Sequence, residues 1–116
     1  MKFEDLRVWQ TSYELYKKIN DIFGKNNYKN YFFGDQILRA TLSISNNIAE
    51  WFERETNNEL RRFLYISKWS CGEVRSMLSI AKNSWDLDDI EFEELYSICT
   101  HISVMLQKYI NTIKPN

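Results

Sequence analysis

The sequence has few residues that favour turns, with three glycines and one proline among 116 residues. Sandwiches and barrels need a turn after every short strand, so this shortage argues against an all-β fold. It favours long helices with few connections. The length is sufficient for one domain, residues 1–116, that buries a core of its own.

An excess of charge of either sign is also missing, since 15 lysines and arginines face 16 aspartates and glutamates and give a net charge of −1. The overall charge therefore indicates neither a nucleic acid nor an anionic membrane as a partner, and any basic site must be a local patch. Apolar runs fall short of the roughly 18 residues that span a membrane. The first residues include acids where a signal peptide is basic and then apolar, so we expect a cytoplasmic protein with no membrane partner.

Residues with metal-binding or catalytic chemistry are scarce. Cys71 and Cys99 lie within apolar helical patterns without a CxxC motif, which predicts reduced and buried thiols. The only histidine, His101, cannot complete the two Glu-x-x-His pairs of a di-iron bundle, and no cation follows it before Lys108 to support phosphotransfer. We interpret it as a flank or interface histidine. No phosphate loop or catalytic triad is recognisable, so we expect a non-enzymatic protein with no metal and no cofactor.

Apolar residues recur with helical spacing in four segments. In the first segment, residues 5–23, they form two adjacent stripes, which is more than packing against a single neighbour requires. A polar stretch at residues 24–30 ends this pattern. A second helix is predicted over residues 35–54.

The third predicted helix begins after a capping box, in which the Thr56 hydroxyl accepts from the Glu59 amide and the Glu59 side chain returns to the Thr56 amide. It ends near Asn83. The fourth helix follows a similar signal at Asp88 and repeats apolar residues at alternating intervals of three and four as far as Ile113. Such regular spacing suits bundle packing, so the predicted fold is an all-α, antiparallel, up-down-up-down four-helix bundle.

A polar stripe follows one face of the second predicted helix and alternates donors with acceptors. Its members are Arg39, Ser43, Asn47, Glu50 and Arg54. One interpretation is an exposed helix face whose side chains pair with each other, and the other is a hydrogen-bonded network between helices or subunits. We expect the second: the stripe should be largely buried together with Arg62 and Glu73, and Glu50 should pair with Arg62.

A basic stripe follows one face of the third predicted helix at a strict seven-residue interval. Its members are Arg61, Lys68, Arg75 and Lys82. No acid interrupts this face, and its cations recur about every 10.5 Å along the helix. With Arg54 at its end and Tyr65 available to stack on a base, the basic stripe is the candidate nucleic-acid-binding site, and the alternative is a solvated helix face.

Three segments carry a family resemblance, namely FEDLRVWQ, DQILRATLSISNNIAEWFER and ELRRFLYISKWSCGEV. They resemble the four helix bundle protein family, also called the 23S rRNA intervening-sequence protein family because some members are encoded within bacterial 23S rRNA genes. The resemblance covers nearly the whole chain and implies a small antiparallel bundle that assembles into a pentameric ring. A more distant resemblance, to the accessory protein of diversity-generating retroelements, implies nucleic-acid binding.

The family pattern carries over onto residues of all but the last predicted helix. These are Trp9, Gln36, Arg39, Ala40, Ser43, Asn47, Ile48, Ala49, Glu50, Arg54, Glu59, Arg62, Phe63, Leu64, Ser70 and Glu73. The chain departs from the pattern at Leu38, where the family has a basic residue, and at Trp51, where it has glycine. These departures and the acidic pI argue against a nucleic-acid-binding role.

The expected function is that of a non-enzymatic homo-oligomer, with a pentamer favoured by the resemblance, that acts as a scaffold or adaptor for RNA, ribosomes or another protein. The alternative is a protein-binding structural ring that makes no contact with nucleic acid. Aromatic residues make up 16% of the chain, and several fall outside the core stripes. Because monomers rarely expose a large apolar patch, this surplus independently favours an oligomer.

Overall fold

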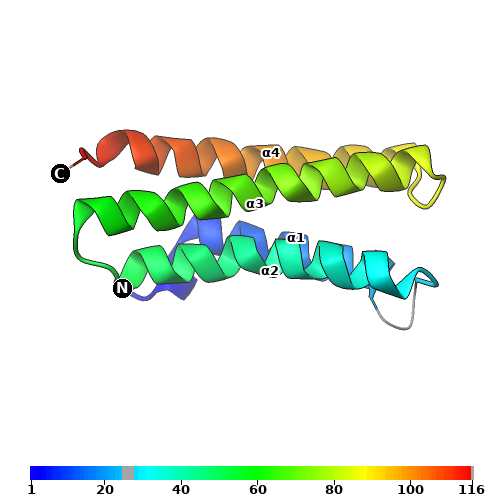
Figure 1. Cartoon of the computed structure of the whole chain (residues 1–116), viewed down its shortest axis with the longest axis horizontal. Helices are drawn as coiled ribbons and strands as arrows, with labels where there is room; N and C mark the ends of the chain where they lie inside the picture. The colour runs from blue at the N-terminus through cyan, green and yellow to red at the C-terminus, as the bar shows by residue number, and fades with distance from the viewer. Residues whose placement is uncertain (25–27, 116) are drawn as a thin grey trace.

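Four long helices follow one another along the chain (Figure 1). The computed structural model describes residues 1–24 and 28–115. A short 3-10 helix, η1 (Phe3–Asp5), precedes the four helices, which are α1 (Arg7–Phe23), α2 (Tyr31–Glu53), α3 (Asn57–Asn83) and α4 (Asp89–Thr112). Figure 1 shows consecutive helices running in opposite directions, which confirms the predicted up-down-up-down bundle.

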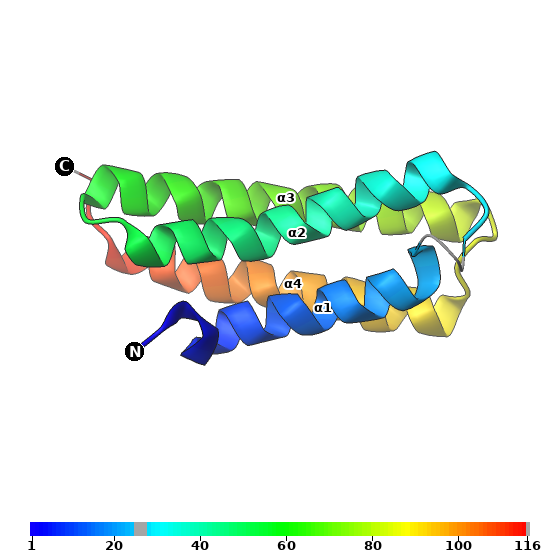
Figure 2. The same cartoon turned by 90° about the horizontal axis from the view of Figure 1, so that it is seen from below.

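Each helix packs against two others. Helices α1 and α3 both contact α2 and α4, while neither diagonal pair makes close backbone contact within the described residues. The four helices therefore form an elongated bundle of 45 × 22 × 21 Å (Figure 2). None of the helices in the described part of the chain is long and apolar enough to cross a membrane.

The core runs along the bundle axis and includes the apolar residues of α4. Leu95, Cys99, Ile102, Leu106 and Ile110 are at most 1% exposed. The predicted repeat at intervals of three and four ran as far as Ile113, but Ile113 is half-buried, and Ile110 is the last buried core residue of the helix. The reason is that a straight helix drifts relative to a strict seven-residue repeat.

The starts of α3 and α4 follow the predicted capping signals. The Glu91 amide donates to Asp88 at 2.7 Å and the Asp88 amide donates to the Glu91 carboxylate at 3.3 Å, which completes a capping box. At α3 the Glu59 amide donates to the Thr56 hydroxyl at 3.3 Å, but that hydroxyl, and not the Thr56 amide, donates to the Glu59 carboxylate. The N-cap prediction is therefore confirmed, and the reciprocal bond differs in its donor.

The predicted start of α2, at residue 35, is wrong by four residues. The Asn30 side chain accepts a hydrogen bond from the Phe33 amide at 3.1 Å, so it caps a helix that begins at Tyr31. The sequence did not indicate Asn30 as the cap, because the polar stretch at 24–30 contains other asparagines. Residues 25–27 of this stretch lie outside the described part of the chain. Likewise, α1 begins at Arg7 and not at residue 5, because η1 comes first.

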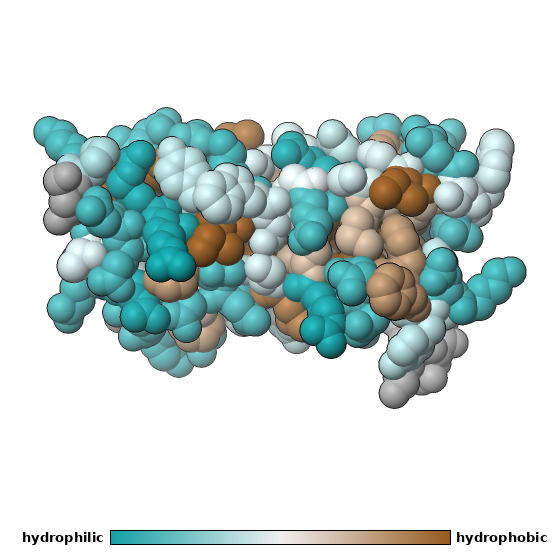
Figure 3. All heavy atoms as spheres, viewed as in Figure 1, coloured by the Kyte–Doolittle hydropathy of each residue, from teal (hydrophilic) through white to brown (hydrophobic). Residues whose placement is uncertain are grey.

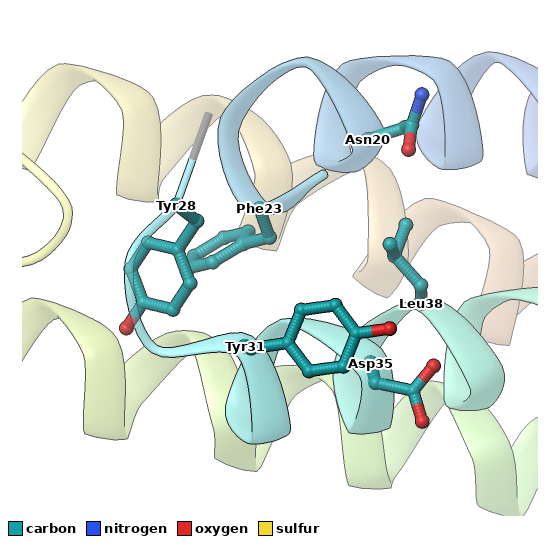
Figure 4. A pocket seen from close by; sticks show the side chains of 6 residues that line it. All are labelled: Asn20, Phe23, Tyr28, Tyr31, Asp35 and Leu38. Carbon is teal, nitrogen blue, oxygen red and sulfur yellow. The ribbon is translucent and has the colours of Figure 1, made fainter. Parts of the chain in front are cut away.

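Tyr28 joins the α1–α2 connection to the α3–α4 connection at one end of the bundle. Its hydroxyl donates to Asp86 in the α3–α4 connection at 2.8 Å, and burial together with this hydrogen bond raises the pKa of Tyr28 to about 12. The Tyr28 ring also meets Phe23 edge to face, with centroids 4.9 Å apart (Figure 4). Beside these rings lies a small hollow of about 200 Å³ whose one carboxylate, Asp35, is already paired with Arg39.

Gly34 allows the close approach of α1 and α2 at this end. A Cβ atom on Gly34 would lie 2.5 Å from the Phe23 carbonyl oxygen, a distance that requires the backbone to move. By contrast, a Cβ atom on Gly72 would meet only the Arg75 guanidinium, at 3.7 Å. Gly34 is therefore required by packing, while Gly72 is not.

We expect Gly34→Ala to lower the free energy of unfolding by about 1–3 kcal/mol, the usual cost of forcing an extra carbon into a packed site. Gly72→Ala is the matched control, because both glycines lie in helices but only Gly34 faces a backbone carbonyl. The control should raise the stability by about 0.5–1 kcal/mol through helix propensity. Urea unfolding followed by circular dichroism measures both, and equal effects at the two positions would contradict this account of Gly34.

Candidate nucleic-acid interface

The basic stripe of α3 faces α4. The four cations of the stripe are half-buried, and each contacts a residue of α4 or its C-terminal cap. The stripe therefore lines a seam between the two helices, which we call the α3–α4 seam. The cations are therefore partly covered by α4 and partly in contact with solvent, and the choice between a binding site and a solvated helix face stays a prediction.

Arg61 holds the C-terminal end of α4. Its guanidinium donates to the carbonyl oxygens of Ile110 at 3.1 Å and Ile113 at 2.6 Å. The last carbonyls of a helix have no partner within the helix, and the negative end of the helix dipole lies there. Arg61 therefore satisfies a helix end, and its charge is opposed by that dipole.

The two outer cations of the candidate site, Lys82 and Arg54, have acidic partners. The Lys82 ammonium lies 3.8 Å from Asp89 and 4.5 Å from the centre of the Phe92 ring. Arg54 binds Glu50 and lies 3.8 Å from Glu59, and the hydrogen bond to Glu50 raises its pKa. Both charges are compensated locally, which weakens their attraction for a polyanion.

The two central cations, Lys68 and Arg75, have neutral partners. The Lys68 ammonium donates to the Gln107 side-chain oxygen, and the Arg75 guanidinium lies 6.0 Å from the centre of the Tyr96 ring. Neither forms an ion pair with a carboxylate of the described residues. The positive charge of the basic stripe is thus concentrated at its centre.

An aromatic pair stands beside Lys68 on α3. The rings of Tyr65 and Trp69 lie 6.0 Å apart at an angle of 31°, and Arg61 covers Tyr65 at 5.6 Å. Trp69 is 67% exposed, so its indole offers a free face for a base to stack on. The sequence-based site included Tyr65 and missed Trp69, although the spacing of four residues could have indicated that the two rings are neighbours.

The uncharged members of the polar stripe, Ser43 and Asn47, bond to each other, and Ser43 also bonds to α3. The Asn47 amide donates to the Ser43 carbonyl at 2.8 Å and to the Ser43 hydroxyl at 3.1 Å. The Ser70 hydroxyl of α3 donates to the same Ser43 hydroxyl at 2.8 Å. Of the expected network, one hydrogen bond therefore joins the two helices, between Ser43 and Ser70, while the bonds of Asn47 stay within α2.

The expectation that the charged members are buried is wrong for the single chain. Arg39, Glu50, Arg54, Arg62 and Glu73 are exposed. Glu50 pairs with Arg54 one turn away and not with Arg62, which forms no ion pair within the described residues. The physical reason is that Arg54 follows Glu50 by four residues, so the two side chains lie on the same face of α2 and its C-cap and pair with each other. This is the self-paired interpretation of the stripe.

Two separate faces of the bundle expose apolar side chains. Aromatic rings of α1 and η1 line a groove of about 260 Å³ that Leu42 of α2 borders, with Trp9 stacked on Tyr13 at 5.6 Å. On another face, apolar residues gather over the start of α2 and the second half of α3 (Figure 3). Phe32 and Ile80, which are 76% and 52% exposed, lie on these segments. We call the first the α1–α2 groove and the second the α2–α3 patch.

The two cysteines are free and buried, as predicted. The Cys99 thiol donates to the Cys71 carbonyl at 3.2 Å. A hydrogen bond with Cys99 and burial raise the pKa of the Cys71 thiol far above its ordinary value. A thiol in this state is a poor nucleophile. His101 is exposed on α4.

The similarity of the chain to known proteins agrees with this architecture. Residues 4–108 match the family described as 23S rRNA-intervening sequence protein. No curated protein matches the chain in sequence at a significant level. Because the family match covers all of α1, α2 and α3, and most of α4, the chain belongs to the 23S rRNA-intervening sequence protein family.

Proposed function

We propose that this protein is a non-enzymatic, homo-oligomeric scaffold or adaptor that binds RNA along the α3–α4 seam. One observation carries the proposal. Lys68 and Arg75 lack carboxylate partners among the described residues, although the chain as a whole carries a net charge of −1. A local pair of uncompensated cations on a nearly neutral molecule is suited to bind phosphates. Membership of a family named for 23S rRNA fits an RNA-related role.

The mode of binding follows from the side chains of α3. Cations contact backbone phosphates, which position a nucleic acid without reading its sequence. Tyr65 and Trp69 add a stacking surface, and base–aromatic stacking tolerates any base. We therefore propose binding that is directed by backbone shape and by unpaired bases, with little sequence specificity.

Assembly would strengthen this weak single site. The family resemblance favours a pentamer, and a closed ring needs two different faces that meet head to tail. The α1–α2 groove and the α2–α3 patch are two such faces, and both leave apolar side chains in water in the single chain. A ring would present one pair of central cations per subunit, and affinity for RNA grows with each phosphate that is neutralised.

The second candidate function is a protein-binding ring that makes no contact with nucleic acid. The observation that favours it is the local compensation of Arg54 and Lys82 by acids, which leaves only the centre of the basic stripe free. In such a ring the exposed apolar faces would serve subunit and partner contacts alone.

Salt dependence distinguishes the two functions. Titrating the protein with a structured RNA that contains single-stranded loops, and with duplex DNA, should show binding that weakens steeply between 50 and 200 mM salt. With two phosphates neutralised per subunit, we expect about a tenfold loss of affinity for each subunit engaged. Fluorescence anisotropy measures this directly. A complete lack of binding at 50 mM salt would favour the protein-binding ring.

A further inference from the structure

A hollow between α1 and α4 combines an apolar surface with two cations. It lies where the start of α1 runs beside the second half of α4 (Figure 2), and its volume is about 330 Å³. The residues that line it are Arg7, Val8, Met105, Lys108, Tyr109 and Thr112. We call it the α1–α4 hollow.

The apolar residues of the α1–α4 hollow are anchored in the core. Val8 is 1% exposed, and the half-buried Met105 and Tyr109 pack against the core. The Tyr109 ring also packs on Trp51 of α2, with the ring centroids 4.8 Å apart. Tyr109 is therefore held in place, while the flexible side chain of methionine adapts readily to an apolar partner.

The two cations of the α1–α4 hollow have no partners. Arg7 and Lys108 are exposed, and neither side chain forms an ion pair or a hydrogen bond with a described residue. Glu4 and Asp5, the nearest acids in the sequence before Arg7, do not pair with it, and no acid lines the hollow. The hollow therefore places uncompensated positive charge beside an apolar surface.

These properties decide which ligand fits. The volume lies at the lower end of the range for ligand pockets, about 300–1,000 Å³, so it suits an apolar side chain better than a large cofactor. An apolar surface gains little from the polar sugars and phosphates of RNA. The hollow also shares no lining residue with the α1–α2 groove, and the α3–α4 seam lies on the other side of α4.

We propose that the α1–α4 hollow binds a segment of a partner protein in which an apolar side chain is flanked by acidic residues. The apolar side chain packs on Met105 and Tyr109, and the carboxylates on either side pair with Arg7 and Lys108. Charge-assisted hydrogen bonds of this kind are stronger than neutral ones. The inference goes beyond the proposed function, because neither RNA nor contact between subunits takes part in it.

Labelled peptides test the two halves of this complementarity. The probe is a peptide that contains Glu-Glu-Phe-Glu-Glu, and its two controls contain Glu-Glu-Ala-Glu-Glu and Lys-Lys-Phe-Lys-Lys. We expect the probe to bind at least about tenfold more tightly than either control, because one control lacks the apolar side chain and the other reverses the charge. Fluorescence anisotropy at low salt measures all three. Failure of the probe to bind, or equal binding of the three peptides, would overturn the proposal.

Charge reversal locates the binding site on the protein. Arg7→Glu with Lys108→Glu should weaken binding of the probe at least about tenfold. Lys17→Glu with Lys29→Glu is the matched control, because it makes the same change in net charge at exposed positions outside the hollow, and it should bind like the wild type. Circular dichroism establishes that both variants fold. Equal losses in the two double variants would assign the binding to total charge and overturn the hollow.

An uncharged substitution provides a second test. Thr112→Trp fills the hollow from an exposed position and should also weaken binding of the probe, whereas a probe that binds this variant like the wild type does not occupy the hollow. If the Arg7 and Lys108 reversals instead abolish RNA binding or dissociate the assembly and leave the probe bound, the hollow serves RNA or a second copy and the proposal is wrong. Failure of the probe alone leaves RNA binding by the α3–α4 seam standing, since the RNA titration measures that separately.

Discussion

Reversing the two central cations, Lys68→Glu with Arg75→Glu, is expected to lower the affinity for RNA more than about 100-fold at 50 mM salt. Two effects act together. Each reversal removes the release of counterions from one phosphate. Each also places a carboxylate beside the RNA backbone, and juxtaposed like charges in an interface cost several kcal/mol. Anisotropy titration of the wild type and the double variant measures the difference.

A matched control separates local charge from total charge. Lys17→Glu with Lys108→Glu makes the same change in net charge, from −1 to −5, because each reversal subtracts two. Both lysines are exposed and lie on α1 and α4. We expect this control to keep most of the affinity of the wild type. If both double variants lose binding equally, the total charge and not the α3–α4 seam determines the interaction.

The basic stripe illustrates what the sequence can predict of a site. Its seven-residue interval places four cations on one face of a helix regardless of tertiary structure, and the structure has them there. Which of them stay uncompensated depends on α4. Lys82 meets Asp89 across the last connection, and Arg61 meets carbonyl groups some 50 positions away in the chain. Helical spacing carries no information about such partners.

The fold was more predictable than the site because its signals are local. The helix caps at Thr56 and Asp88 depend on side chains three residues apart, so they could be located from the sequence. Asn30 caps α2 by the same chemistry, but no glutamate or glutamine follows it at the third position to complete the signal. The prediction that the charged residues of the polar stripe are buried was wrong for another reason. Periodicity shows which residues share a face of α2, but not whether a neighbour covers that face.

The other large effect concerns assembly. We expect light scattering of the wild type to give a mass that is a multiple of 14.0 kDa, with five subunits favoured by the family resemblance. The α2–α3 patch is one of the two faces that the ring would bury. A single charge in the centre of such a contact removes apolar area and has no partner there, so its effect is large.

Ile80→Glu tests this face directly. It should shift the protein to a species of 14.0 kDa at micromolar concentration, while circular dichroism retains the helix content, because Ile80 is 52% exposed in the single chain. Val104→Glu is the matched control: Val104 is similarly apolar and 49% exposed, but it lies on α4, away from the patch. The control should keep the mass of the wild type. A wild-type mass of 14.0 kDa would refute the oligomer, and an assembly that Ile80→Glu leaves intact would exclude the α2–α3 patch as its interface.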